Sequence, residues 1–204
     1  MKKLLVLIFS LFFLSSPSVF ADDISDFQIE GISIGDSLLD YMTEDEILKE
    51  MELSKNDYYY LNEPSKYSEI YKRKNLQTFD VLAFIVKNTP TNEYITNKNN
   101  KYTILSIRGI TIYADDLDGC LQKRDGIVEE LSKMFPYAQK TEDSYVFDLD
   151  QTFTDEVSFI LDSGNQVEIS CIDYTETISI KNNWDDNLSV AIDSKEIISW
   201  LGDY

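Results

Sequence analysis

Histidine is absent from the 204-residue sequence. Its absence excludes His-based catalytic triads and His-ligated zinc sites, and it removes the commonest general base of enzymes. Basic side chains are also scarce: 18 Lys and Arg oppose 37 Asp and Glu, for a formal net charge of −19. Such an acidic surface disfavours nucleic acid and anionic membranes as partners. A basic protein, a cation or solubility alone fits the charge better.

Only two cysteines occur, Cys120 and Cys171. Cys120 falls on the apolar face of a predicted helix, and Cys171 shares the alternation of Val167 and Ile169 on a predicted strand. A helix packed on that face of the strand brings the two sulfur atoms together, so the sequence predicts a Cys120–Cys171 disulfide in an oxidising compartment. A redox-active pair is the alternative, but the cysteines are not arranged as C-x-x-C.

Residues 1–21 have the pattern of a secretory signal peptide. Two lysines precede an apolar run from Leu4 to Leu14, and Val19-Phe20-Ala21 forms a small-residue cleavage site. The run is too short for a permanent membrane anchor, and no cysteine follows it for lipoprotein processing. We therefore expect a mature protein that is cleaved after Ala21 and is periplasmic or secreted.

The pattern that organises the chain runs from Ile104 to Phe135. Apolar residues mostly alternate over 104–113, as in a strand with one buried face. They change parity at Arg108-Gly109, so a β-bulge is expected there. Asp115 and Asp116 can cap a helix that ends before Pro136. The helix has apolar residues at i, i+3, i+4 and i+7: Leu117, Cys120, Leu121, Ile127, Val128, Leu131, Met134 and Phe135.

Arg124 lies inside this apolar stripe. Its side chain is expected to extend to solvent or to form an ion pair with a carboxylate on the sheet. The alternative is that Arg124 forms a functional anion-binding site.

Further strands and helices complete an α+β fold with an antiparallel sheet and helices mainly on one face. Thr43 and Glu46 form a capping box for an early helix, and Asp193 with Glu196 is expected to cap a C-terminal one. Residues 182–186 are expected to form a polar loop. The expected strands are residues 67–73, 79–87 (central, covered on both faces), 145–149, 157–161, 167–174 and 188–192, with a hairpin turn at 162–165.

The order of elements repeats: a helix and three strands over residues 36–113, then again over 117–174. Together they form a single α+β domain over residues 22–204, with possible halves 27–113 and 114–204. Ile34-Gly35 followed by Thr43-x-x-Glu46-Ile47 is similar to the opening of the helix-and-three-strand modules of the outer-membrane assembly lipoprotein BamE and of β-lactamase inhibitor proteins. This resemblance implies protein recognition on the exposed face of a concave sheet, although the lipoprotein's modified cysteine is missing.

The opening IEGISIGDSLLDY also looks like that of uncharacterised exported proteins of marine alphaproteobacteria. Within it, Gly35-Asp36-Ser37-Leu38 resembles the nucleophile block of the GDSL esterases. That family also needs a catalytic histidine, which this chain lacks. We therefore interpret the block as a glycine turn with Asp36 capping a short helix.

Oxygen-rich segments at 148–156 and at Asp185-Asp186-Asn187 are candidate Ca²⁺ ligands. The first lacks the glycine of an EF-hand loop, and the alternative for Asp148 is a place on the solvent face of a strand. Carboxylate pairs could also serve glycoside hydrolysis without histidine, but a chain with 37 acids offers such pairs by chance. No metal, no cofactor and no catalytic residue is therefore expected.

Tyrosines and basic residues gather in one region of the sequence, as they do in many protein interfaces. Packing at the edge of the core is the alternative for these tyrosines. The candidate binding residues are Tyr58, Tyr59, Tyr60, Tyr67, Tyr71 and Arg73.

We expect an exported soluble binding or envelope-interaction protein with no evident catalytic site, whose partner is another envelope or secreted protein. The alternatives are a small-ligand or glycan binder that uses the tyrosines and a carboxylate-dependent hydrolase. A pocket lined by two carboxylates favours the hydrolase, a pocket lined by tyrosine rings favours the glycan binder, and a sheet with no cleft counts against both.

Overall fold

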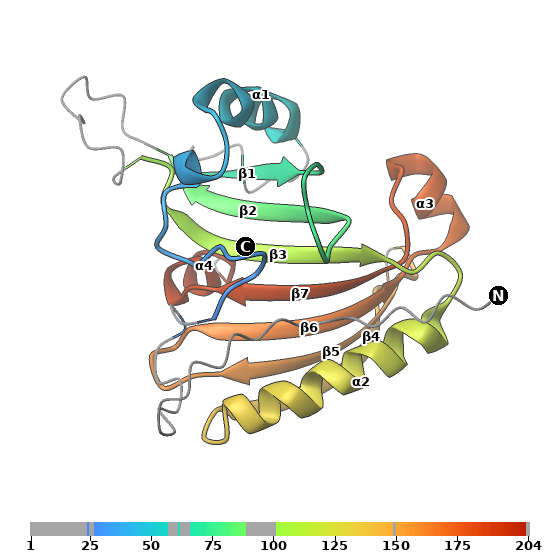
Figure 1. Ribbon diagram of the computed structural model, residues 1–204. Coiled ribbons are helices and arrows are strands. Elements are labelled where there is room, and N and C mark those ends of the chain that lie inside the picture. The colour runs from blue at the N-terminus through green and yellow to red at the C-terminus, as the bar shows by residue number, and fades with distance from the viewer. Residues whose placement is uncertain are drawn as a thin grey trace.

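The computed structural model describes residues 24, 27–56, 61, 66–88, 101–148 and 150–202. The expected signal peptide and Tyr58–Tyr60 lie outside these residues. Seven strands form one antiparallel sheet in the order β1-β2-β3-β7-β6-β5-β4, which confirms the α+β class (Figure 1). The strands are β1 (Tyr67–Lys72), β2 (Val81–Lys87), β3 (Ile104–Ile112), β4 (Gln139–Val146), β5 (Phe153–Ile160), β6 (Gln166–Asp173) and β7 (Asn187–Asp193).

The helices of the described chain are α1 (Glu44–Ser54), α2 (Leu117–Met134), α3 (Glu176–Asn182) and α4 (Lys195–Leu201). The predicted order of a helix and three strands, followed by a second helix and three strands, is confirmed. β7 then lies between β3 and β6 and joins the two sets into one sheet. Within the described ranges, no helix has both the length and the apolar character needed to cross a membrane.

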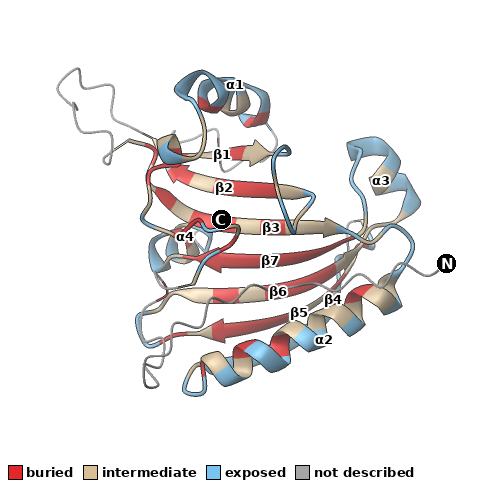
Figure 2. Ribbon diagram, viewed as in Figure 1, coloured by how far each residue is buried: buried red, intermediate tan, exposed pale blue. Residues whose placement is uncertain are grey.

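One face of the sheet carries the main core. Every residue of β7 is buried, as Figure 2 shows, because the strand has neighbours on both sides and is packed on both faces. The predicted hairpin of β5 and β6 is confirmed, with Val157 opposite Ile169 and Phe159 opposite Val167. These residues belong to the core, which continues into α1 through Ile47 and into α2 through Val128 and Leu131.

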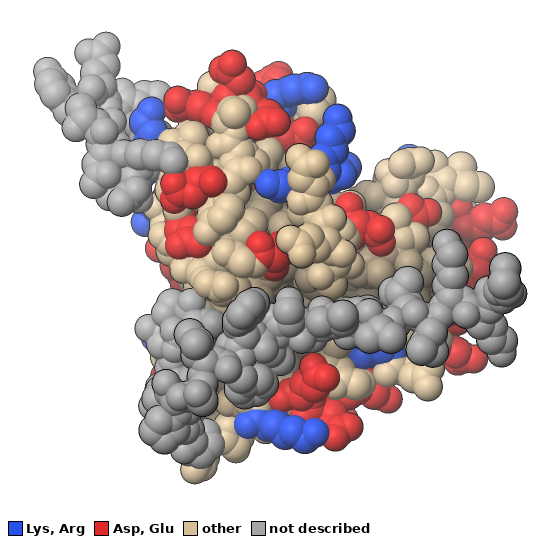
Figure 3. Space-filling model, viewed as in Figure 1, with Lys and Arg blue, Asp and Glu red and all other residues tan. Residues whose placement is uncertain are grey.

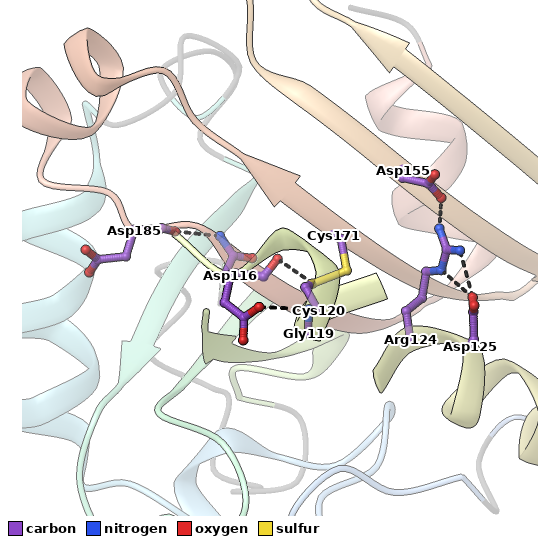
Figure 4. The surroundings of a disulfide bond; sticks show 9 residues. Asp116, Gly119, Cys120, Arg124, Asp125, Asp155, Cys171 and Asp185 are labelled. Carbon is purple, nitrogen blue, oxygen red and sulfur yellow. Dashed lines mark hydrogen bonds and ion pairs between the residues drawn. A yellow bond between two sulfur atoms is a disulfide. The ribbon is translucent and has the colours of Figure 1, made fainter. Parts of the chain in front are cut away.

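The beginning of α2 is fixed by its cap and by the disulfide (Figure 4). Asp116 accepts a hydrogen bond from the backbone N–H of Gly119 at 2.9 Å. Cys120, one turn into the helix, is bonded to Cys171 of β6, with Cα atoms 6.0 Å apart. The predicted disulfide is therefore present and ties α2 to the sheet.

Arg124, one turn further along α2, forms ion pairs with Asp155 of β5 and with Asp125 (Figure 4). The expected ion pair with a carboxylate on the sheet is thus confirmed. On the face drawn in Figure 3, acidic and basic side chains are interspersed over α1 and α2.

The β-bulge in β3 is not at the predicted place. The register shifts at Leu105, since Ile85 pairs with Ser106 and Val86 with Ile104. Ile107 and Gly109 therefore face the core, whereas Arg108 and Ile110 face the opposite side. Gly109 is required for a different reason: a Cβ atom there would lie 2.8 Å from the ring of Phe79.

Two other expectations are corrected. The cap of α4 is Ser194, whose Oγ accepts from the N–H of Ile197, and Asp193 is instead the last residue of β7. Helix α3 was not predicted, because none of its side chains is buried and it shows no apolar stripe. Its last residue, Asn182, is the first residue of the expected polar loop.

Replacing both cysteines by alanine should destabilise the protein by about 4 kcal/mol, because the disulfide closes a loop of 51 residues. Urea unfolding monitored by circular dichroism measures this difference. The wild-type protein treated with a reductant is the control and should match the double variant. An unchanged midpoint would show that the crosslink does not stabilise the fold.

Gly109→Ala should destabilise the protein by about 1–3 kcal/mol, because the new methyl group overlaps the Phe79 ring. Gly126→Ala is the matched control, since Gly126 is exposed in α2 with no neighbouring atom within 4 Å of the added Cβ. It should stabilise the protein by about 0.5–1 kcal/mol. Equal effects of the two changes in thermal unfolding would contradict the proposed contact.

Candidate functional site

The second face of the sheet carries the candidate site. We call it the α4 face and define it by the side chains that alternate with the core residues, among them Arg108 of β3, Glu168 of β6 and Asp193 of β7. Arg108 and Glu168 are both paired with Ala191 of β7, one from each side. The strand order therefore brings charged residues from distant parts of the sequence close together on this face of the sheet.

Helix α4 is held on this face at the edge formed by β1 and β2. Ile197 is buried, and the ring of Trp200 lies 4.6 Å from that of Tyr67 in an edge-on contact. The Tyr67 hydroxyl donates to Glu196 at 2.6 Å, and Lys87 donates to the same carboxylate at 3.0 Å. These hydrogen bonds hold the pKa of Glu196 below its usual value, while burial raises that of Tyr67.

A cavity of about 240 Å³ lies between α4 and the sheet. Five strands and the helix contribute to its lining, which is charged or polar on one part and aliphatic on another. The lining residues are Glu69, Ala83, Ile85, Ser106, Arg108, Gln166, Glu168, Asp193, Ile198 and Leu201. This arrangement can hold a small group that is polar at one end and apolar at the other.

The charged part of the lining is organised around Ala191. The backbones of Arg108 and Glu168 lie two strand spacings apart, about 10 Å, on either side of Ala191. Their side chains reach each other across the small side chain of Ala191, with an N–O distance of 3.8 Å. Ala191 has no exposed surface. A larger residue at this position would block the ion pair.

Asp193 is the most deeply buried acid of the lining, with 8% of its surface exposed. Ser106, directly opposite on β3, donates its hydroxyl to Oδ1 of Asp193. Burial raises the pKa of the Asp193 carboxyl, against the opposing effects of Arg108 and of this hydrogen bond. Because Asp193 pairs with Gln166, Glu168 is its diagonal neighbour, at about 7 Å between Cβ atoms.

The pKa of Glu168 is shifted in the same direction as that of Asp193. Burial is the main cause of its raised pKa, and the negative charges of Asp193 and Glu156 add to the effect. The nearby Arg108 guanidinium opposes it. The cavity therefore has two carboxyls that ionise less readily than usual.

Of the predicted tyrosine patch, the structure describes Tyr67, Tyr71 and Arg73. Tyr67 is 1% exposed and packs beneath α4 against Trp200. Tyr71 pairs with Ala83, a cavity residue, and the Arg73 guanidinium lies 4.6 Å from the centre of its ring. Arg73 also reaches Glu50 of α1 at 3.5 Å. Tyr71 and Arg73 thus flank the cavity rather than line it.

Ser37, in the GDSL-like block, is 3% exposed. Its hydroxyl donates to the carbonyl of Lys101 and accepts from the N–H of Leu39, so it caps the short helix Leu38–Asp40. The cap is Ser37 and not Asp36, which instead accepts from the Tyr41 hydroxyl at 2.6 Å. Burial and this contact raise the pKa of Tyr41 to about 12. These contacts give the block a structural role.

The candidate calcium ligands contact protein groups. Asp150 accepts from the N–H of Thr152, and Asp155 pairs with Arg124. Asp186 accepts from the N–H groups of Asp115 and Tyr174. Over the residues that the structure describes, no three or more His, Cys, Asp or Glu side chains are grouped as for a metal ion.

No protein-family model, curated protein or solved structure matches the chain. The assignment of function therefore depends on the site alone. The cavity residues Ser106, Arg108, Glu168 and Asp193 were not predicted from the sequence. A signal was present: each is a polar residue that alternates with apolar residues along its strand.

Glu168→Gln should raise the melting temperature at pH 7. A carboxyl whose pKa is raised by folding lowers stability only where it ionises, so the gain should disappear near pH 4, below the pKa of the unfolded chain. Glu129→Gln is the control, because Lys133 lowers the pKa of Glu129 and this change should not stabilise the protein. A loss of stability at pH 7 for Glu168→Gln would contradict this account.

Proposed function

We propose that this protein is an exported, non-catalytic binding protein and that the cavity on the α4 face is its binding site. The observation that carries the proposal is the set of charged and polar side chains in the cavity, partly covered by α4. Burying Asp193 and Glu168 disfavours their ionised forms, as their raised pKa values indicate. Such groups are typical of functional sites rather than of sites selected for stability.

The electrostatics support binding over hydrolysis. A carboxylate-dependent glycosidase needs one carboxyl with a raised pKa as acid and a second that stays ionised as nucleophile or base. In the cavity, burial shifts the pKa values of Glu168 and Asp193 in the same direction. These shifts give no support to the division of roles that this mechanism requires.

The lining also supports a small ligand over a glycan. Sugar rings stack on exposed aromatic faces. The described residues that line the cavity are aliphatic, polar or charged, and the nearby ring of Tyr67 packs against Trp200. A group with an aliphatic part fits this lining better.

Two features support export. Residues 1–21 have the charge and apolar pattern of a signal peptide, and a disulfide is most stable in an oxidising compartment. The partner would then be a secreted or envelope protein that inserts one side chain, or a small molecule with the same chemistry.

The test is a titration of ¹⁵N-labelled residues 22–204 with a panel of four-carbon probes: n-butylamine, n-butylguanidine, n-butanol and butyrate. We expect at least one probe to shift the amide signals of the cavity strands saturably. Ala83→Leu, which fills the cavity, should abolish the response. Val81→Leu is the matched control, on the same strand and face but outside the lining, and should leave it unchanged. Absence of any saturable shift would refute the proposed function.

A further inference from the structure

The charge of the cavity is unbalanced. Its lining contains three carboxylates, from Glu69, Glu168 and Asp193, and one guanidinium, from Arg108. The Arg108 guanidinium lies 3.8 Å from Glu168, and the ionised Asp193 carboxylate leaves an excess of negative charge beside this pair. In a partly buried site, such an excess attracts a positive group more strongly than it would in water.

Asp193 has an oxygen available to a ligand. Ser106 donates to Oδ1, and no second hydrogen bond to this carboxylate is found within the described part of the chain. The side chain is more than nine-tenths buried and lines the cavity. A carboxylate oxygen is a hydrogen-bond acceptor, so Oδ2 can accept a hydrogen bond from a donor in the cavity.

The size and the aliphatic part of the lining restrict what carries this donor. The volume of about 240 Å³ is below the roughly 300–1,000 Å³ usual for drug-sized ligands. Ile85, Ile198 and Leu201 form the apolar part of the lining. The cavity therefore suits one short aliphatic stem that ends in a charged donor.

From these observations we infer that the cavity recognises an ammonium or guanidinium group on an aliphatic stem. This inference rests on the proposed function and specifies its ligand. The charged group donates to Asp193 and Glu168, and the stem packs on the aliphatic residues of β2 and α4. The same chemistry occurs in a free alkylamine and in a lysine or arginine side chain of a partner protein.

Binding of such a cation depends on pH. The charged groups that face the two carboxyls are Arg108 of β3, Glu69 of β1 and Glu156 of β5, and the cavity residues of α4 are uncharged. As the pH falls, Glu168 and Asp193 become protonated and their attraction for a cation is lost. Affinity for n-butylamine should therefore rise with pH from 4 to 8, while its ammonium stays charged.

The experiment compares dissociation constants of the four probes at pH 7.5. We expect n-butylamine and n-butylguanidine to bind at least about tenfold more tightly than n-butanol, and butyrate not to bind. Asp193→Asn and Glu168→Gln should each weaken n-butylamine binding by about tenfold or more. Glu129→Gln, which neutralises an exposed acid of α2, is the matched control and should have no effect. A dispersed amide spectrum verifies that each variant is folded, and Glu168→Gln carries the test if Asp193→Asn does not fold.

The outcomes separate the two claims. Saturable binding of butyrate or n-butanol that equals or exceeds that of the amine would overturn the inference while leaving the binding function intact. No binding by any probe would overturn both. If cations bind, Nα-acetyl-lysine methylamide distinguishes the sources: tighter binding than n-butylamine supports a partner's side chain, and weaker binding supports a free amine.

Discussion

The insertion of β7 between β3 and β6 is the constraint on which the rest of the structure depends. Without it, the sheet would consist of two three-stranded pieces, each with an unpaired inner edge. β7 comes last among the strands and pairs over its whole length with residues about 80 positions earlier in β3. Its seven residues are all buried, which requires both faces to be covered. Such long-range pairing is typical of slow folding, because a large loop must close before the contacts form.

The same strand creates the site. Ala191 provides the small surface over which Arg108 reaches Glu168, and Asp193 contributes the buried carboxylate. The Arg108–Glu168 ion pair cannot form in the separate halves, since its two partners come from β3 and β6. The insertion of β7 therefore completes both the sheet and the cavity. The two faces of the sheet are specialised accordingly: the core face is apolar and fixed by the disulfide, and the α4 face retains charged groups that weaken the fold at neutral pH.

Local features of this fold could be predicted from the sequence. Alternation identified the β5–β6 hairpin, the Thr43–Glu46 capping box was found directly, and the parity of Cys171 with its neighbours predicted its bond to Cys120. The predictions from the sequence were wrong where the position of a single residue decides the local structure. A bulge at Leu105 instead of at Gly109 reverses the face of Ile110, and Ser194 rather than Asp193 caps α4.

The site was harder to predict, because its parts are far apart in the sequence. Arg108, Glu168 and Asp193 come together only through the strand order, and alternation within a strand does not encode its neighbours. The tyrosine cluster was recognisable because its residues are close in the sequence, yet Tyr67 holds α4 through Glu196 and Trp200. The signal in the sequence was the set of polar residues that alternate with core residues along buried strands. These residues can be grouped into one site only when the order of the strands in the sheet is known.

The most direct test of the account is a ¹³C NMR titration of the side-chain carboxyls of Asp193 and Glu168, with and without saturating n-butylamine. The account predicts pKa values above the ordinary values of about 3.9 and 4.3 in the free protein, and a fall in both when the amine is bound. Ordinary pKa values that do not change on addition of the amine would contradict the claim that these carboxylates form a cation-binding cavity.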